Sequence, residues 1–430
     1  MTELMLPQNW SSKRLKYLAT YNDEVLPEST DKEKEIDYVE ISGVSFAHGI
    51  EEIERMSFDQ APSRARRKVR SNDILISTVR TYLRAIAKVD EASPDLIAST
   101  GFCVVRPNDE VESEFLGWAA KSEPFVSEVV TRSVGVSYPA INASELVTIY
   151  MPLPPLDSQR KISWFLDEKI ARIDRLIEKK QKLIDRLAEK RQALITRTVS
   201  KGLNPDTSLK PSDIGARRDD HRTAESAVDV IAFPTRRLRF ACEDPLKYGA
   251  NAAAQYDDPE WPRFVRITDI TESGQLKDNS FRSLPPDIAE DYLLEDGDIL
   301  LARSGSIGRS FIYKTEWGEA CFAGYLIRAR LSKEFDPRFV YWSLNTLNYW
   351  SWIESIAIRS TIQNVSAERY AEYAVPAPPL DTQRRIAQFL DEKTAQIDGL
   401  IDRIWDSVAR LEEYRSAQIT AAVTGQLTEL

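Results

Sequence analysis

The stretch PLPPLDSQRKISWFLDEKIARIDRLIEK begins at Pro152 and returns as PAPPLDTQRRIAQFLDEKTAQIDGLIDR at Pro376. The two copies keep a constant offset of 224 residues (376 − 152) as far as Ile195-Thr196 and Ile419-Thr420. Similarity at a fixed offset is the signature of an internal repeat. The sequence therefore predicts two half-chains built on one plan, each ending in the same element.

Each copy of the repeat has the pattern of one long helix. A Pro-Pro pair keeps the preceding backbone extended, and the predicted N-cap residues are Asp157 and Asp381. Beyond them, apolar residues alternate in steps of three and four, which is typical of a coiled-coil seam. Charged residues fill the positions between, as a solvated face requires. In the first copy the seam residues are Leu166, Ile170, Ile173, Ile177, Ile184, Leu187 and Leu194.

Two such helices in one chain can pack in two ways. Because their seams match, we expect the helices to pack on each other as a rod; the alternative is that each packs on its own globular domain. Gly202 and Gly425 stand where a glycine commonly ends a helix. The predicted helices therefore span residues 156–201 and 380–424.

The remaining sequence forms two blocks with a loosely matching order of strands. Asp73-Ile74-Leu75-Ile76 in the first block corresponds to Asp298-Ile299-Leu300-Leu301 in the second. The strand cores match and the loops differ, as expected of two modules that bind different ligands. The polar stretch between the halves has the composition of a linker. The predicted domains are a first block, a first helical region, a linker, a second block and a second helical region, at 1–151, 152–202, 203–234, 235–375 and 376–430.

Composition fits a protein of a reducing compartment. The 430 residues allow two to three domains, and no apolar run approaches the length of a membrane span. The N-terminal sequence MTELMLPQNW lacks the pattern of a secretory signal, and three cysteines without metal spacing predict a cytoplasmic protein. With two histidines, the chain has no histidine metal cluster.

The sequence contains no convincing active site. It has no phosphate-binding, zinc-protease or serine-hydrolase motif, and no Asn/Asp-Pro-Pro-Tyr/Phe stretch of the kind that amino-methyltransferases use to hold a target base. The Asp-Glu-Lys triplets at 167–169 and 391–393 are interpreted as solvated helix charges. The chain is therefore predicted to be non-catalytic, with no cofactor and no metal.

With no active site in the sequence, the remaining possibility is a binding function. A net charge of −10 argues against a nucleic-acid partner unless cations cluster locally. One cluster lies beside a predicted strand and comprises Arg64, Arg66, Arg67, Lys68 and Arg70, with an ordinary solvated loop as the alternative. Other polar residues follow the matched strands or end the loops beyond them. Arginine can pair with guanine, and Asn or Gln can either pair with adenine or satisfy turns. These candidates are Arg80, Tyr82, Arg84, Ser133, Ser137, Tyr138, Asn142, Arg303, Ser304, Ser306, Arg309, Arg359, Ser360, Thr361, Gln363 and Asn364.

The repeated P-x-P-P-L-D-x-Q-R-x-I-x-x-F-L-D-E-K start, the long helices and the Asp-Ile-Leu strands resemble the DNA-specificity subunit of Type I restriction-modification systems. The resemblance covers nearly the whole chain. It implies an α+β fold in which two mixed α/β target-recognition domains are separated by two long antiparallel coiled-coil helices, with an internal pseudo-twofold repeat. The linker departs from the family because it lacks the tryptophan-containing lead-in that commonly begins the second recognition domain.

The resemblance also implies the partners. Each recognition domain would bind one half of a bipartite, asymmetric site in double-stranded DNA, and the helices would set the gap. Two modification subunits, which methylate adenine N6, would dock on the helices, and two restriction subunits would add ATP-driven translocation and cleavage. The specificity subunit itself would catalyse nothing and would need no membrane.

Two alternatives remain open. The chain could serve a Type IIB-like enzyme whose methylase and nuclease share one chain, or it could be a coiled-coil assembly protein that no longer recognises DNA. The sequence determines neither the bases of the two half-sites nor the gap between them.

Overall fold

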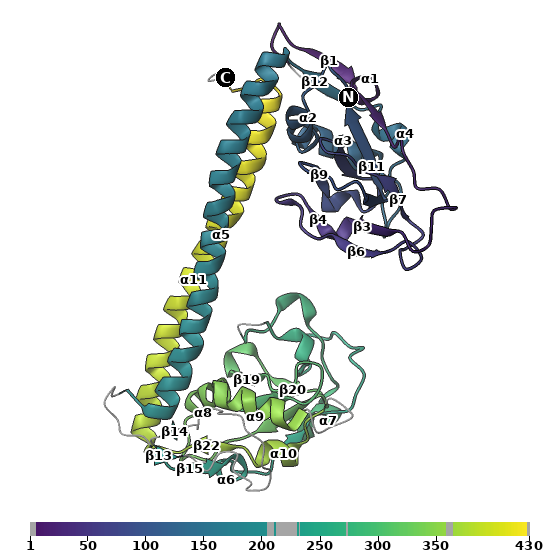
Figure 1. Ribbon diagram of the computed structural model, residues 1–430. Coiled ribbons are helices and arrows are strands. Elements are labelled where there is room, and N and C mark those ends of the chain that lie inside the picture. Colours follow the sequence, from purple (N-terminus) through teal and green to yellow (C-terminus); the bar gives the residue numbers. More distant parts are fainter. Residues whose placement is uncertain are drawn as a thin grey trace. The chain divides into compact units, whose positions relative to one another are not determined.

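The computed structural model describes residues 6–203, 210–211, 230–231, 233–271, 274–357 and 364–427. The chain forms two compact units: unit 1 comprises residues 1–182 and 404–430, and unit 2 comprises residues 183–403. Each unit contains one mixed domain and one part of each long helix (Figure 1). Domain 1 denotes residues 11–153, and domain 2 denotes residues 235–376. Most of the predicted linker lies outside the described residues.

Both predicted long helices are confirmed. Helix α5 spans Leu156–Lys201 and helix α11 spans Leu380–Val423, with 46 and 44 residues. The predicted caps are wrong, because Asp157 and Asp381 lie inside the first helical turn. Each helix begins directly after its Pro-Pro pair, and the second proline's carbonyl accepts the N–H four residues later at 3.0 Å in both copies. A carboxylate in the first turn still interacts favourably with the helix dipole.

The two long helices pair antiparallel within each unit, side by side in Figure 1. In unit 1 the first half of α5 shares a buried core with the last turns of α11, and in unit 2 the last turns of α5 share a core with the start of α11. Domain residues complete both cores, so both of the packing modes considered above occur together.

One ion pair crosses between the helices in each unit. Asp174 pairs with Arg415 at 2.8 Å in unit 1, and Arg191 pairs with Asp398 at 2.8 Å in unit 2. The two aspartates occupy matching repeat positions, as do the two arginines. The same contact is therefore made twice with the helices exchanged, which confirms the pseudo-twofold repeat.

Domain 1 contains two four-stranded sheets. Its elements are β1 (Ser11–Arg14), α1 (Leu15–Leu18), β2 (Ala19–Tyr21), β3 (Glu35–Val39), β4 (Val44–Ser45), β5 (Gly49–Ile50), β6 (Glu54–Ser57), β7 (Ala65–Lys68), β8 (Ile74–Ser77), β9 (Ile86–Lys88), β10 (Leu96–Ser99), β11 (Phe102–Pro107), α2 (Ser113–Ala120), α3 (Glu123–Arg132), α4 (Ala143–Leu146) and β12 (Tyr150–Leu153). The strand orders are β2-β11-β8-β9 and β6-β3-β10-β7. Every residue of β8 and β10 is buried, as their nearly continuous apolar sequences require.

Domain 2 repeats this plan with fewer strands. Its elements are β15 (Thr235–Arg237), α6 (Leu238–Ala241), β16 (Lys247–Tyr248), β17 (Arg263–Val265), α7 (Pro286–Ala289), β18 (Ile299–Ala302), β19 (Ser310–Ile312), β20 (Ala320–Phe322), β21 (Leu326–Ala329), α8 (Pro337–Ser343), α9 (Leu347–Ala357), α10 (Ala367–Ala371) and β22 (Ala374–Pro376). A short pair, β13 (Lys210–Pro211) and β14 (Val230–Ile231), lies before them. Sheet β16-β21-β18-β19 corresponds to β2-β11-β8-β9, and the parallel pair β17-β20 corresponds to β3-β10.

A buried glutamine joins the start of each long helix to its domain. The Gln159 amide Nε2 donates to the carbonyls of Pro154 at 2.9 Å and Glu110 at 3.2 Å, and its Oε1 accepts the Glu112 N–H at 2.8 Å. Gln383 makes the same three bonds to the corresponding residues of unit 2, at 2.8, 3.1 and 2.9 Å. The glutamine of the repeated motif therefore fixes how each helix leaves its domain.

Further matched contacts hold the helices against the domains. The indole N–H of Trp118 donates to Asp167, and that of Trp342 donates to Asp391, both at 2.8 Å. The interpretation of the Asp-Glu-Lys triplets as solvated charge is therefore incomplete, since the aspartate of each triplet binds a tryptophan. The opposite helix contributes Thr420, whose hydroxyl oxygen accepts the backbone N–H of residue 123 at 3.1 Å.

An aromatic side chain closes the C-terminal end of each long helix. Gly202 and Gly425 both have positive φ, 78° and 73°. A Cβ at Gly425 would lie 3.3 Å from the Trp10 ring, and one at Gly202 would lie 3.0 Å from the Phe233 ring. Phe233 thus lies beside the end of α5 in unit 2, as Trp10 lies, together with Pro7, beside the end of α11 in unit 1.

An ion pair of the same geometry, between a buried aspartate and a half-buried arginine, joins the ends of two neighbouring strands in the central sheet of each domain. Asp73 is 1% exposed and accepts two bonds from the Arg106 guanidinium, at 2.8 and 2.9 Å. Asp298 is likewise 1% exposed and accepts two bonds from Arg330 at the same distances. The Asp residue that begins each predicted strand is therefore a structural ion-pair partner.

Replacing Asp73 with Ala is expected to destabilise unit 1 by about 2–3 kcal/mol, because the Arg106 charge then loses its buried partner and keeps only the half-exposed Asp23 and Glu24. The denaturant midpoint of unfolding, followed by intrinsic fluorescence, measures this effect. The matched control is Asp59→Ala, which breaks an exposed pair with Lys32 and should leave the midpoint unchanged. Equal shifts for the two variants would contradict the structural role of the buried pair.

Candidate nucleic-acid interface

The basic cluster of domain 1 is a strand rather than a loop. Residues 65–68 form β7, which is the last strand of its sheet and pairs with β10. Its outer edge is covered by an extended segment, because the Leu26 N–H donates to the Arg66 carbonyl at 2.8 Å and the Lys68 N–H donates to the Glu24 carbonyl at 3.1 Å. The strand displays its cations on a rigid backbone.

Acidic neighbours neutralise part of this cluster. Arg64 pairs with Glu40 at 2.7 Å, and the hydrogen bonds that Arg64 donates to Tyr38 and Glu40 raise the pKa of its guanidinium. Arg70 pairs with Glu24, and Arg66 lies 4.7 Å from the centre of the Phe58 ring. Among the described residues, none forms an ion pair with Arg66, Arg67 or Lys68. The Arg67 Nε is buried without a hydrogen-bond partner, so the half-buried Arg66 and Lys68 are the cations of the cluster with charge to offer a ligand.

Two loops meet beside the central sheet of domain 1. We call residues 78–84, which follow β8, the exit loop, and residues 133–142 the tip loop. The Ile141 N–H donates to the Thr78 carbonyl at 2.9 Å. In domain 2 the Val365 N–H donates to the Arg303 carbonyl at the same distance. Both domains therefore make the same backbone hydrogen bond, which we call the backbone lock. It places different side chains at the same edge of the central sheet.

Side chains of domain 1 join its two loops further. The Arg80 guanidinium lies 4.7 Å from the centre of the Tyr138 ring, and the hydroxyls of Thr81 and Ser133 are 2.8 Å apart. Arg84 instead donates two bonds of 2.8 Å to the Glu123 carboxylate. The structure thus brings Arg80, Ser133 and Tyr138 together. The Arg84 guanidinium, in contrast, is occupied by an ion pair within the protein. Tyr82, Ser137 and Asn142 are exposed.

Candidate residues of domain 2 lie around Arg303. Its Nε donates to the Asn364 side-chain oxygen at 3.1 Å, and its guanidinium lies 4.8 Å from the centre of the Tyr248 ring. Arg309 donates to the Thr271 carbonyl at 3.2 Å. Ser304 and Ser306 are half-buried. The remaining candidates, Arg359, Ser360, Thr361 and Gln363, lie outside the described residues.

The sequence analysis missed several exposed apolar residues of these loops. Val134 is 80% exposed, Val136 fully exposed and Leu83 51% exposed in domain 1, and Tyr325 is 66% exposed in domain 2. The sequence contains a signal for them, because the two valines stand beside glycine and serine in a predicted loop. Candidates chosen for charge or polarity do not include these valines.

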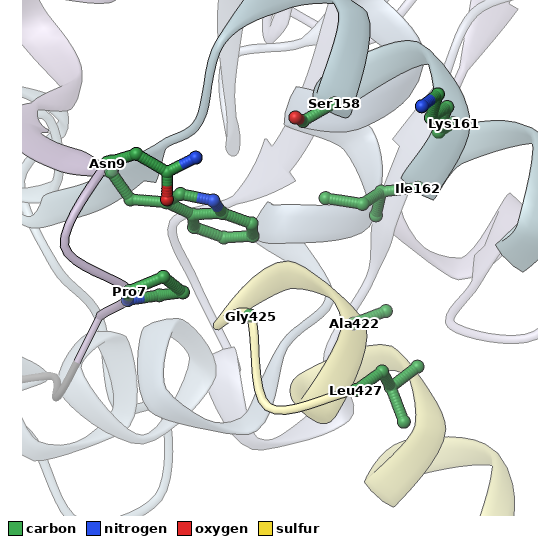
Figure 2. A pocket seen from close by; sticks show the side chains of 9 residues that line it. Pro7, Asn9, Ser158, Lys161, Ile162, Ala422, Gly425 and Leu427 are labelled. Atoms are coloured by element: carbon green, nitrogen blue, oxygen red, sulfur yellow. The ribbon is translucent and has the colours of Figure 1, made fainter. Parts of the chain in front are cut away.

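Two hollows of unit 1 lie apart from these loops. One, of about 200 Å³, lies between the N-terminal segment, the start of α5 and the end of α11, with Trp10, Lys161 and Leu427 among its lining residues (Figure 2). The other, of about 450 Å³, surrounds the paired Asp73 and Arg106.

The described residues include no group of three or more His, Cys, Asp or Glu side chains that could hold a metal ion. Burial raises the pKa of the Cys103, Cys242 and Cys321 thiols to about 12, which makes them poor nucleophiles. No described helix has the length and apolar character needed to cross a bilayer.

Known proteins share this sequence pattern. The family model of the Type I restriction modification DNA specificity domain matches residues 7–186 and 261–404. The chain belongs to this family. It is 23% identical to the Type I restriction enzyme EcoKI specificity subunit of Escherichia coli strain K12 over 84% of this chain and 76% of that one. It is 29% identical to the EcoBI specificity subunit of Escherichia coli, over 38% of this chain and 33% of that one.

Solved structures share the fold of this family member. A chain from a structure on complex assembly and conformational transition of the type I R-M system has a TM-score of 0.71 at 22% identity, covering 98% of this chain and 99% of that one. The HsdS subunit from Thermoanaerobacter tengcongensis has a TM-score of 0.52 at 23% identity, covering 99% of both. The family and the fold predicted from the repeated motif are both confirmed, whereas the individual DNA-contacting residues remain predictions.

Replacing Lys68 with Gln should weaken DNA binding several-fold and lower the slope of log affinity against log salt by about 1, because one phosphate contact is lost. The measurement is fluorescence anisotropy of the chain with its modification subunits on their target duplex at several salt concentrations. The control is the double variant Arg64→Gln/Glu40→Gln, which removes an internally neutralised pair without changing the net charge. If the control loses as much affinity as the Lys68 variant, β7 does not contact DNA.

Proposed function

We propose that this chain is the non-catalytic, sequence-specific DNA-binding subunit of a Type I restriction-modification complex. Each domain binds one half of a bipartite, asymmetric site in double-stranded DNA, and the paired helices set the gap. The observation that carries the proposal is the shared backbone lock at Thr78 and Arg303, which presents different side chains from one scaffold. Two domains with one scaffold and different side chains in the loops bind different half-sites, so the target is asymmetric.

We further propose that two modification subunits dock on the long helices and that two restriction subunits join them in the cytoplasm. Support comes from exposed residues that are kept at the 224-residue offset. Leu176 and Leu400 match and are 48% and 43% exposed. Glu168 and Glu392 also match and face solvent. Because these residues are exposed, packing within the chain does not explain why they are the same in both halves. Their repetition fits two equivalent surfaces that bind two copies of one partner protein.

The chain's acidity fits this assembly. A net charge of −10 limits the DNA affinity of the chain alone, because phosphate binding depends on cations. Modification subunits that enclose the same DNA would supply the remaining charge.

The decisive experiment is methylation mapping in cells. The chain is co-expressed with its neighbouring modification subunit, and N6-methyladenine is located in the DNA with and without the chain. A two-part motif with one fixed gap, present only with the chain, is expected because the two domains and the helix pair are parts of one molecule. Variable gaps between the two parts of the motif would contradict the proposal that the paired helices set the gap. Absence of chain-dependent methylation despite a folded complex would favour a purely structural assembly protein.

Replacing Leu176 and Leu400 together with Asp should abolish the assembly with two modification subunits, and each single variant should retain one. A buried charge in an interface is costly, so a loss of at least about tenfold in affinity per site is expected. Light scattering coupled to gel filtration gives the stoichiometry. The control is Ile288→Asp, which charges an equally exposed apolar residue (42%) that lies away from the long helices. A full complement of partners on the double variant would exclude this docking surface.

A further inference from the structure

The tip loop of domain 1 is a rigid hairpin. Val134 and Ala140 exchange two backbone hydrogen bonds of 2.8 and 3.0 Å, and the Arg80 N–H donates to the Pro139 carbonyl at 2.8 Å. Gly135 has φ +119°, and a Cβ there would lie 3.1 Å from the Tyr138 carbonyl oxygen, so only glycine fits the turn without strain. The hairpin is locked to the exit loop on one side and closed on itself on the other.

This rigid hairpin holds apolar side chains in water. Val136 at its apex is fully exposed, and Val134 and Tyr138 on either side are 80% and 64% exposed. Tyr82 and Leu83 of the neighbouring exit loop are more than half exposed as well. Contiguous exposed apolar surface on a preformed element is typical of a binding site, because contact with a partner removes it from water.

The surroundings of the hairpin favour nucleic acid as the partner. Neither the tip loop nor the exit loop contains an acidic residue, in a chain with 67 of them. Arg80 lies at the base of the hairpin against the Tyr138 ring, and the only other cation of the two loops, Arg84, is neutralised by Glu123. Two loops without acidic residues, with a cation below an apolar apex, complement a phosphate backbone beside stacked bases.

From this arrangement we infer that Val136 is a wedge that enters the base stack of the half-site bound by domain 1. The inference rests on the proposed function and adds a residue to it. The apex inserts between two adjacent base pairs and partly unstacks them, while Arg80 holds the neighbouring phosphate. Because steps differ in the cost of unstacking, the wedge discriminates sequences by deformability at a step where no base edge is bound.

Position-by-position fluorescence of 2-aminopurine tests the wedge. The base analogue is placed in turn at each position of the duplex identified by methylation mapping, and the full complex with modification subunits is added. Stacking quenches its fluorescence, so the wild-type complex should produce an increase at one step of a half-site, apart from the target adenines, which methyltransferases themselves take out of the stack. Val136→Ala should remove that increase and weaken binding about tenfold, whereas Val136→Leu should retain it. A tenfold loss corresponds to about 1.4 kcal/mol.

Controls separate the possible causes of failure. Ile53→Ala truncates another exposed apolar residue of domain 1 (51%) and should change neither signal nor affinity. An increase that persists in Val136→Ala overturns the wedge, as does loss of subunit assembly in that variant, which would identify the hairpin as a protein contact. Failure of the wild-type complex to prefer its mapped duplex over a scrambled one would instead overturn the proposed function.

Discussion

One buried glutamine in each half determines how this protein is built. Its amide satisfies three backbone groups where the chain leaves a domain and enters a long helix, and it does so with the same partners in both halves. An amide with this many fixed bonds tolerates little change in the angle between helix and domain. Since the tryptophan–aspartate bonds repeat the same restraint two turns further along, domain and helix form one rigid body within each unit. Helix pairing and loop placement both depend on this junction.

The same restraint explains where the two halves can differ. Strand cores, the buried Asp–Arg pairs and the helix junctions are each fixed by burial, and a change at any of them leaves an unpaired charge or an unfilled cavity. The exit and tip loops are joined by backbone hydrogen bonds, which do not depend on side-chain identity, and also by the Arg80–Tyr138 and Thr81–Ser133 contacts. Exposed side chains outside these contacts are free to vary while the loop position stays constant. This combination suits a family whose members recognise different sequences on one scaffold.

Charged residues are distributed unevenly over the chain. The long helices α5 and α11 carry acidic and basic residues in alternation on their solvated faces, with 19 basic and 15 acidic residues together, so the chain's acidity comes from the residues outside them. Within domain 1, by contrast, acids are absent from the exit and tip loops, and Glu40 and Glu24 neutralise the outer members of the basic cluster. The cations left available belong to the rigid strand β7 and to Arg80. The net charge of the chain therefore describes neither the long helices nor these available cations.

The sequence by itself determined the repeat, the two long helices, their seam and the family, because each depends on local periodicity or on a motif of adjacent residues. It also predicted that Arg80 and Tyr138 belong to one surface, although not that they touch. Only the tertiary structure decided that Arg84 is committed to Glu123, that the basic cluster is an edge strand with two neutralised members, and that Val136 stands fully exposed. The physical reason is that ion pairing and exposure depend on residues far away in the chain. A sequence pattern records the side chain but not the neighbour that neutralises or buries it.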